Sequence, residues 1–444
     1  MEDPQKKEGL VQLEYGPNDP PRSNRDTFIY SLQWVLIMFY PVVWGYAIVG
    51  LGLEMSGDVL SAYMGRVVLM IGLATLLQTV IGHRFAMVSG PNIIPSLAIV
   101  AAFTVGGAEY GFQSFNAYIF AGVIVALLGA FGVISLIGKV WTPLVLGSMI
   151  MMIGLAVSAD GMELIAAYGP TWPYYFGILL ALICGWLSIR GRAIWATIPV
   201  LVAIVLGYAG FMVMGEFNWE LVHQMPTFVT PELFPFGLQM PPFDLIVTMT
   251  VVNIFAAINL YGNVQGYANI IQADVPTARE RRYFTLFGLL EGSLAGILGV
   301  PSHVSYGENL GFILLTRVAA RLFIIIASIA FIILSFVGPM GGLMAAMPQP
   351  VAGAVLLGVA STLIGLGAST WHEREFGTRE IFIVGFSVFF ALGSAQLPQS
   401  FFDQLPRLVG SLLNNPVIVV IIVVILLEQI VFKERQKTTK DIET

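Results

Sequence analysis

The chain has 444 residues, of which 57% are hydrophobic and only 11% are charged, and its mean hydropathy is +0.83. A soluble globule of this composition would expose far more apolar surface than such proteins tolerate, so we predict an integral membrane protein. The net charge of −6 excludes little, because the position of each charge matters more in a membrane than the sum. The single cysteine, Cys184, excludes an internal disulfide, and no metal-ligand spacing is present, so no cofactor is expected.

Apolar segments follow one another along almost the whole chain. Residues 1–26 are polar and are predicted to form a cytoplasmic tail, as are residues 433–444. Crossing the hydrocarbon as a helix takes about 20 apolar residues. We expect fourteen such segments, although those between 283 and 338 run together and leave the number open by one or two. They lie near 27–50, 59–82, 85–105, 115–137, 141–157, 171–189, 193–214, 243–264, 283–300, 303–318, 319–338, 345–367, 380–396 and 412–432.

The distribution of lysine and arginine supports an even number of segments. With a cytoplasmic N-terminus, these residues should follow even-numbered segments or lie in the tails, because cytoplasmic loops are enriched in positive charge. Only Arg66 and Arg407 fall elsewhere. We therefore expect a multi-pass protein of the cell membrane with both termini in the cytoplasm. The residues that fit the pattern are Lys6, Lys7, Arg22, Arg25, Arg84, Lys139, Arg190, Arg192, Arg279, Arg281, Arg282, Arg317, Arg321, Arg374, Arg379, Lys433, Arg435, Lys437 and Lys440.

The segments divide into two halves of seven. Residues 27–214 and 243–432 are joined by a polar, proline-rich connection at 215–242, expected outside the cytoplasm. An odd number of crossings per half gives the halves opposite orientations, as in many secondary transporters. The predicted fold is therefore an all-α polytopic membrane protein of fourteen segments, arranged as a 7+7 inverted repeat.

Segments three and ten are interrupted at corresponding places. Residues 84–89 and 302–306 are short, partly β-branched or aromatic stretches that stop at a glycine, after which a helical pattern begins. We predict a short strand and a half-helix in each segment, with Pro91 as a first helical residue. Two half-helix N-termini near the midplane would offer amide donors to a polar ligand. Plain helices with tolerated glycine and proline are the alternative.

The run Glu308-Asn309-Leu310-Gly311-Phe312-Ile313-Leu314-Leu315-Thr316-Arg317 places a carboxylate and an amide in apolar surroundings, where such groups are costly and usually functional. It fits the pattern (Gln/Glu/Pro)-Asn-x-Gly-x-x-x-x-Thr-(Arg/Lys/Gly). The run therefore resembles the signature of the nucleobase/ascorbate transporter family, the xanthine/uracil permeases, and the resemblance extends over residues 27–432.

The resemblance implies a core domain of segments one to four and eight to eleven, and a gate domain of segments five to seven and twelve to fourteen. It places the substrate between segments three and ten. It also implies a homodimer and coupling to co-transported H⁺ or Na⁺.

Glu308 is the strongest candidate for binding and for coupling. A carboxylate at a half-helix N-terminus can accept the paired N–H donors of a planar ring, and it can also titrate. A structural role in stabilising the helix break is the alternative. The other binding candidates from segments three and ten are Asn309, Gly307, Tyr306, Gly90 and Asn92. Glu291 is a second buried acid, which we expect to pair with a neighbouring helix.

Segments one and eight depart from the family pattern. Where nucleobase-transporting members usually carry Glu-x-x-Gly-Asp, or a histidine for that aspartate, this chain has Asn259-Leu260-Tyr261-Gly262-Asn263. The spacing keeps both amides on one helix face but removes their charge. In segment one a Gln-His pair is replaced by Gln33-Trp34. These four residues, Asn259, Asn263, Gln33 and Trp34, are also binding candidates.

Two substrate hypotheses follow from these departures. The protein transports a nucleobase-like heterocycle such as uracil, xanthine or another purine, or it transports an organic anion such as urate or ascorbate, which carboxylates would repel. A membrane receptor or scaffold that no longer transports is a third alternative. An enzyme is not expected, because no nucleophile, base and orienting group occur together. The run Arg279-Glu280-Arg281-Arg282 is interpreted as a loop anchor, so the expected partners are a small molecule and the lipid bilayer, not nucleic acid.

Overall fold

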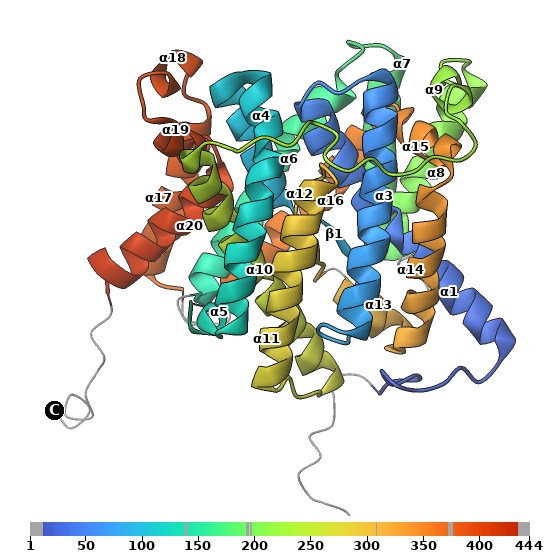
Figure 1. Ribbon diagram of the computed structural model, residues 1–444, viewed down its shortest axis with the longest axis horizontal. Helices are drawn as coiled ribbons and strands as arrows, with labels where there is room; N and C mark the ends of the chain where they lie inside the picture. The colour runs from blue at the N-terminus through green and yellow to red at the C-terminus, as the bar shows by residue number, and fades with distance from the viewer. Residues whose placement is uncertain are drawn as a thin grey trace, which may run out of the picture.

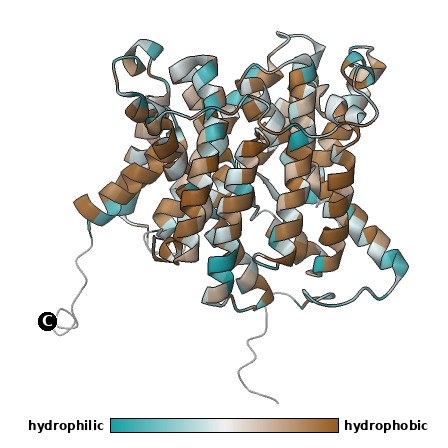
Figure 2. Ribbon diagram, in the orientation of Figure 1, coloured by the Kyte–Doolittle hydropathy of each residue, from teal (hydrophilic) through white to brown (hydrophobic). Residues whose placement is uncertain are grey.

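The computed structural model describes residues 12–137, 141–191, 195, 198–307, 309–371 and 376–433. Its helices stand side by side between two polar faces, and hydrophobic residues dominate the band between those faces (Figures 1 and 2). Within the described residues, eight helices are long and apolar enough to cross a membrane, or nine if a pair bent by 89° near the C-terminus counts as one. These helices support a multi-pass membrane protein, whereas the number of fourteen crossings and the inverted repeat stay predictions.

In the first half of the chain, the described residues form helices, one short strand and the loops that join them. In chain order its elements are α1 (Asn24–Met38), α2 (Tyr40–Trp44), the π-helix η1 (Gly45–Gly50), α3 (Gly57–Val80), β1 (Ser89–Pro91), α4 (Ile93–Ala130), α5 (Val133–Ile137), α6 (Pro143–Ile165), α7 (Trp172–Arg190), α8 (Pro199–Val213) and α9 (Glu220–His223). The two segments expected at 85–105 and 115–137 fall largely within α4, which consists of two helices that meet at a kink. The kink is at Gly107, whose φ of 78° only glycine adopts readily, so the chain bends there without a loop.

The second half again has one short strand. Its elements are α10 (Phe243–Ile271), α11 (Thr277–Leu286), the π-helix η4 (Phe287–Leu294), α12 (Ala295–Ile297), β2 (His303–Ser305), α13 (Asn309–Thr316), α14 (Arg321–Ser335), α15 (Gly338–Ala345), α16 (Gln349–Trp371), α17 (Thr378–Ala395), α18 (Gln399–Phe402), α19 (Arg407–Leu413), α20 (Pro416–Leu426) and the π-helix η5 (Leu427–Val431).

The two short strands pair with each other in the middle of the molecule (Figure 1). They are antiparallel, with Ser89 opposite Ser305, Gly90 opposite Val304 and Pro91 opposite His303. The prediction of a strand within 302–306 is confirmed. The strand predicted within 84–89 lies further along the chain, because β1 spans Ser89–Pro91.

The prediction that Pro91 opens the following helix was wrong. Pro91 ends β1, and Asn92 is the N-cap of α4, with its side-chain oxygen accepting a hydrogen bond from the Ile94 N–H at 3.0 Å. Asparagine is among the preferred N-cap residues, so the cap sets the first helical residue at Ile93, two positions after the proline.

Helices α6 and α16 pack closely along their length through glycines. An added Cβ at Gly154 of α6 would lie 2.8 Å from the Ala360 carbonyl oxygen of α16, and one at Gly353 of α16 would lie 2.4 Å from the Gly161 oxygen. Small residues allow this approach of two backbones, which is a common basis of helix association in membranes.

Replacing Gly154 by alanine is therefore expected to force α6 and α16 apart and lower the thermal unfolding midpoint by several degrees, since overpacking costs about 1–3 kcal/mol. Gly365→Ala on α16 is the matched control, because a Cβ there meets nothing within 4 Å. Equal midpoints of the two purified variants in detergent would contradict the close packing.

Candidate functional site

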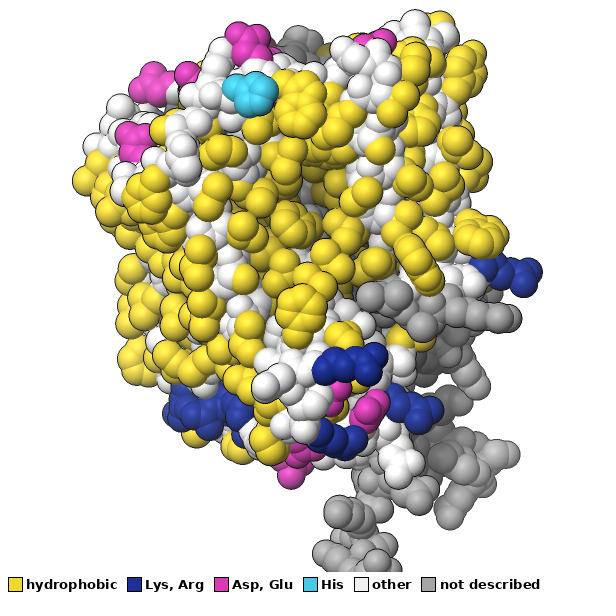
Figure 3. Space-filling view, turned by 90° about the vertical axis from the view of Figure 1, so that its right-hand side faces the viewer, with side chains coloured by type: hydrophobic (Ala, Val, Ile, Leu, Met, Phe, Trp, Pro, Cys, Tyr) yellow, Lys and Arg dark blue, Asp and Glu magenta, His cyan; other side chains and the backbone are white. Residues whose placement is uncertain are grey.

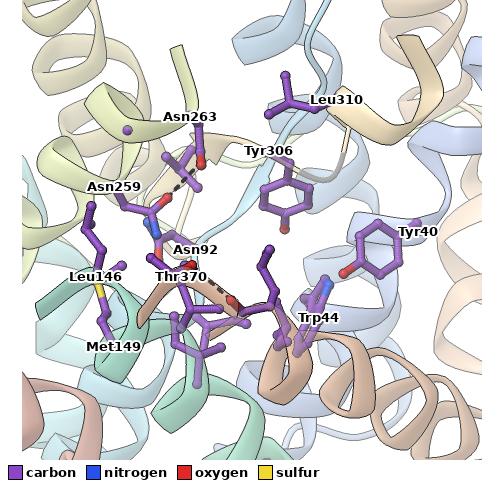
Figure 4. A pocket seen from close by; sticks show the side chains of 18 residues that line it. Tyr40, Trp44, Asn92, Leu146, Met149, Asn259, Asn263, Tyr306, Leu310 and Thr370 are labelled. Carbon is purple, nitrogen blue, oxygen red and sulfur yellow. Dashed lines mark hydrogen bonds between the residues drawn. The ribbon is translucent and has the colours of Figure 1, made fainter. Parts of the chain in front are cut away.

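A cavity of about 360 Å³ lies beside the paired strands. One wall comes from α2, α4, α10, β2 and the turn into α13, and the opposite wall comes from α6 and α16 (Figure 4). Its volume is within the range typical of sites for small molecules. The lining residues are Tyr40, Trp44, Asn92, Ile93, Leu146, Met149, Ile150, Ile153, Asn259, Gly262, Asn263, Val304, Tyr306, Gly307, Leu310, Leu363, Leu366 and Thr370.

Two asparagines of α10 form the polar side of the cavity. The Asn263 Nδ2 donates to Asn259 Oδ1 at 2.8 Å and to the Ser305 carbonyl oxygen of β2 at 2.8 Å. Both donors of Asn263 are thereby used. The Nδ2 of Asn259 and the Oδ1 of Asn263 make no hydrogen bond to any residue that the structure describes, so an amide donor group and an acceptor oxygen remain for a ligand.

Asn92, the N-cap of α4, adds a further donor. Its Oδ1 caps α4, whereas its Nδ2 is buried and has no partner among the described residues. A buried amide without a partner costs free energy unless a ligand or water satisfies it. The Nδ2 of Asn92, a residue that lines the cavity, could therefore donate a hydrogen bond to an acceptor on a ligand.

Aromatic rings stand across the cavity from the asparagines (Figure 4). The ring of Tyr306 lies 5.9 Å from that of Tyr40, which in turn lies 6.0 Å from Trp44, both measured between centroids. The Tyr306 hydroxyl donates to the Pro91 carbonyl oxygen at 2.7 Å, which fixes the ring against β1. A flat ligand would find amide groups at its edge and aromatic surface beside it.

Glycine is required where the backbone approaches these groups. A Cβ at Gly307 would lie 2.6 Å from Asn263 Oδ1, and one at Gly90 would lie 2.4 Å from the Pro41 Cβ. Real Cβ atoms do not come so close, so each glycine allows a contact that shapes the site. Gly262 also lines the cavity, but a Cβ there meets nothing within 4 Å.

The structure brings together five of the predicted binding residues. Asn92, Asn259, Asn263, Tyr306 and Gly307 all line this one cavity.

Three other candidates, Gly90, Gln33 and Trp34, are not among the residues that line the cavity. Gly90 lies behind Tyr306, while Gln33 and Trp34 are outside the lining, with the buried Trp34 packing on Phe312 at 4.5 Å between ring centroids. Glu308 and the side chain of Asn309 lie outside the described residues, so their roles stay predictions.

Sequence reasoning missed the wall from α6 and α16. Its residues are mostly leucine, isoleucine and methionine, which at helical spacing look the same whether they face lipid, another helix or a ligand. Tyr40 and Trp44 were missed as well. Their position six to ten residues after the Gln33-Trp34 pair was the only available signal.

A buried polar cluster lies behind the strands. The Gln78 Nε2 of α3 donates to Glu291 Oε2 of η4 at 2.6 Å, which confirms that Glu291 pairs with a neighbouring helix. Ser305 contacts both Ser89 Oγ at 2.7 Å and His83 Nε2 at 3.0 Å through its hydroxyl. Among the described residues, no group of three His, Cys, Asp or Glu side chains is arranged to hold a metal ion.

Comparison with known proteins identifies relatives over most of the chain. It is 28% identical over 408 residues to the uric acid transporter UacT of Escherichia coli K12, covering 88% of this chain and 82% of that protein. It is 27% identical to the uracil permease of Bacillus caldolyticus, with 86% and 90% covered. It is 24% identical to the nucleobase transporter PlUacP of Paenibacillus larvae, with 87% and 90% covered.

Solved structures share the fold at low sequence identity. The transmembrane domain of the cyanobacterial bicarbonate transporter BicA has a TM-score of 0.58 at 13% identity, covering 92% of this chain and 98% of that one. Murine Slc26a9, an anion transporter in the inward-facing state, has a TM-score of 0.60 at 12% identity, with 90% and 68% covered.

The sequence profile of one family, described as the Permease family, matches residues 25–400. The matched range includes the Glu308 to Arg317 signature and every residue that lines the cavity. The members are transporters and not enzymes. Since the match covers most of its length, this chain belongs to the Permease family, that of the xanthine/uracil permeases.

Proposed function

We propose that this protein is a secondary transporter of a nucleobase-like heterocycle, such as uracil, xanthine or another purine. The pairing of amide groups with aromatic rings in one cavity carries the proposal. Nucleobases are flat and carry alternating N–H donors and carbonyl acceptors along their edge. Asn259 and Asn92 offer N–H donors and Asn263 offers an oxygen, which suits such an edge.

The two walls of the cavity suggest how transport proceeds. The polar wall comes from elements of the expected core domain, and the apolar wall comes from α6 and α16 of the expected gate domain. Movement of one wall against the other would open the cavity to each side in turn, as alternating access requires. Because both acids of segment eight are replaced by amides, Glu308 carries coupling to H⁺ or Na⁺ in this proposal. The working unit is a homodimer.

The charged ends of the molecule suggest its orientation. On the face shown in Figure 3, Lys and Arg gather toward the lower end, whereas the upper end carries acids and a histidine. The positive-inside rule places the lower end in the cytoplasm of a cell-membrane protein, with both termini on that side.

An organic anion such as urate is the second candidate. No Asp or Glu is among the described residues that line the cavity, so an anion meets no repulsion from them. The relatives that are uric acid transporters also favour this candidate.

Uptake into proteoliposomes distinguishes the two substrates. We expect saturable uptake of radiolabelled uracil, xanthine or hypoxanthine. Saturable uptake of urate would instead support the anion hypothesis. In both cases we expect Glu308→Gln to abolish the dependence of uptake on an ion gradient. Asn259→Glu should weaken urate uptake at least tenfold through charge repulsion and leave a neutral base bound. Tighter binding of urate to Asn259→Glu would contradict the anion hypothesis. Binding without saturable uptake of any of these compounds would instead indicate a receptor or scaffold.

A further inference from the structure

Arg66 lies in a second cavity, which shares no lining residue with the first. We propose that Arg66 and the walls of this cavity form a binding site for a small monovalent anion, such as a halide. The site is independent of the substrate proposed above.

Arg66 is a buried cation without a hydrogen-bonded counter-ion in the described part of the chain. It lies within α3 and is only 3% exposed, and its Nε has no hydrogen-bond partner among the described residues. No carboxylate in the described part of the chain comes within 4 Å of its guanidinium. Its guanidinium carbon lies 5.8 Å from the centroid of the Phe236 ring, and the carboxylate of Glu232 attracts its charge from beyond 4 Å. A buried charge without a hydrogen-bonded counter-ion is costly, and a bound anion would reduce that cost.

The space beside Arg66 suits a small ion. The cavity has a volume of about 140 Å³ and lies between α3, the α14–α15 junction and the connection between the halves, which crosses in front of α3 in Figure 1. Ser61, Ser335 and Thr230 line it together with Arg66. The hydroxyls of Ser61 and Ser335 donate to the carbonyl oxygens of Gly57 and Ile332, at 3.1 Å and 2.7 Å.

The connection between the halves, residues 215–242, is held over the cavity by backbone hydrogen bonds to the α14–α15 junction. The Val229 N–H donates to the Phe336 carbonyl oxygen at 2.9 Å, and the Gly338 N–H donates to the Thr227 oxygen at 3.2 Å. The wall over the site is therefore hydrogen-bonded to the helices beneath it, which gives the cavity a defined shape.

Glu232 is the one acid that lines the cavity among the described residues. Its side chain is exposed to solvent and forms no ion pair with Arg66 within 4 Å. A carboxylate at the entrance reduces the affinity for anions by repulsion and disfavours multivalent anions most. The site should therefore bind a small monovalent anion in preference to a multivalent one.

The test measures the thermal unfolding midpoint of the purified full-length protein while sodium chloride replaces sodium gluconate at constant sodium. Gluconate, a six-carbon anion, is much larger than chloride and serves as the comparison anion. Because a ligand stabilises the state that binds it, we expect a saturable rise of the midpoint with chloride. Gly65→Leu fills the cavity without altering Arg66, since a Cβ at Gly65 meets only the Ser335 oxygen at 3.8 Å. It should abolish the rise, as should Arg66→Gln.

Two further variants make the outcome decisive. Arg407→Gln removes an exposed arginine that also lies over an aromatic ring, and it should keep the chloride response. Glu232→Gln should at least halve the chloride concentration at half-saturation. The proposal is overturned if the wild-type midpoint is equal in the two salts, if the response persists in Gly65→Leu, or if Glu232→Gln abolishes it.

Discussion

Gly307→Ala is expected to weaken substrate binding roughly tenfold to a hundredfold, because it displaces the amide on which the polar wall depends. The added Cβ would lie 2.6 Å from Asn263 Oδ1. Turning Asn263 away breaks its hydrogen bonds to Asn259 Oδ1 and to the Ser305 oxygen, each worth about 0.5–1.5 kcal/mol. The dissociation constant of the best substrate, measured by calorimetry or tryptophan fluorescence on purified protein, gives the loss directly.

Gly262→Ala is the matched control for this variant. Gly262 lines the same cavity, but its Cβ would meet nothing within 4 Å, so affinity should change less than twofold. Equal affinities of the two alanine variants would mean that the contact between Gly307 and Asn263 does not shape the binding site.

Gln78→Leu is expected to lower the free energy of unfolding by about 2–3 kcal/mol, because it removes the hydrogen-bond donor of a buried acid. Glu291 is completely buried, and the Gln78 Nε2 at 2.6 Å is the partner of its Oε2. Its Oε1 already has no partner among the described residues. Denaturant or thermal unfolding in detergent, followed by circular dichroism, measures the change.

The double variant Gln78→Leu/Glu291→Leu separates the lost hydrogen bond from simple disruption of packing. Replacing both members of a buried polar pair by apolar residues is often neutral, so the double variant should regain most of the stability lost in Gln78→Leu. Strictly additive losses in the two single variants and the double variant would show that the pair is not energetically coupled.

The polar side of the cavity could be predicted because Asn259 and Asn263 occupy the positions of two acids in the family pattern. Asn259 and Asn263 are four residues apart in an apolar helix, and this spacing places them side by side on one face. The structure shows both at the cavity, joined by a hydrogen bond. Tyr306 and Gly307 could be assigned to the site because they precede the family signature directly.

Three details of the site could not be predicted from the sequence, because the residues concerned are compatible with more than one structure. Pro91 suits both a strand end and a helix start, and the capping by Asn92 decided in favour of the strand end. Trp34 was placed in the site because of the residue it replaces in the family pattern, yet its ring is buried against Phe312, outside the cavity lining. The apolar wall from α6 and α16 depends on how two distant helices dock, which no local pattern encodes.

The pairing of β1 with β2 also bears on the order of events during synthesis. Ser89 and Ser305 are 216 residues apart, and Tyr306 of the later segment is fixed by the carbonyl oxygen of Pro91 in the earlier one. The ribosome must therefore finish most of the chain before either strand finds its partner. Until then, the backbone groups of β1 lack their partners within the membrane, where unpaired polar groups are unfavourable. Ligand-binding competence thus marks the end of folding, and a truncated chain that inserts correctly would still lack it.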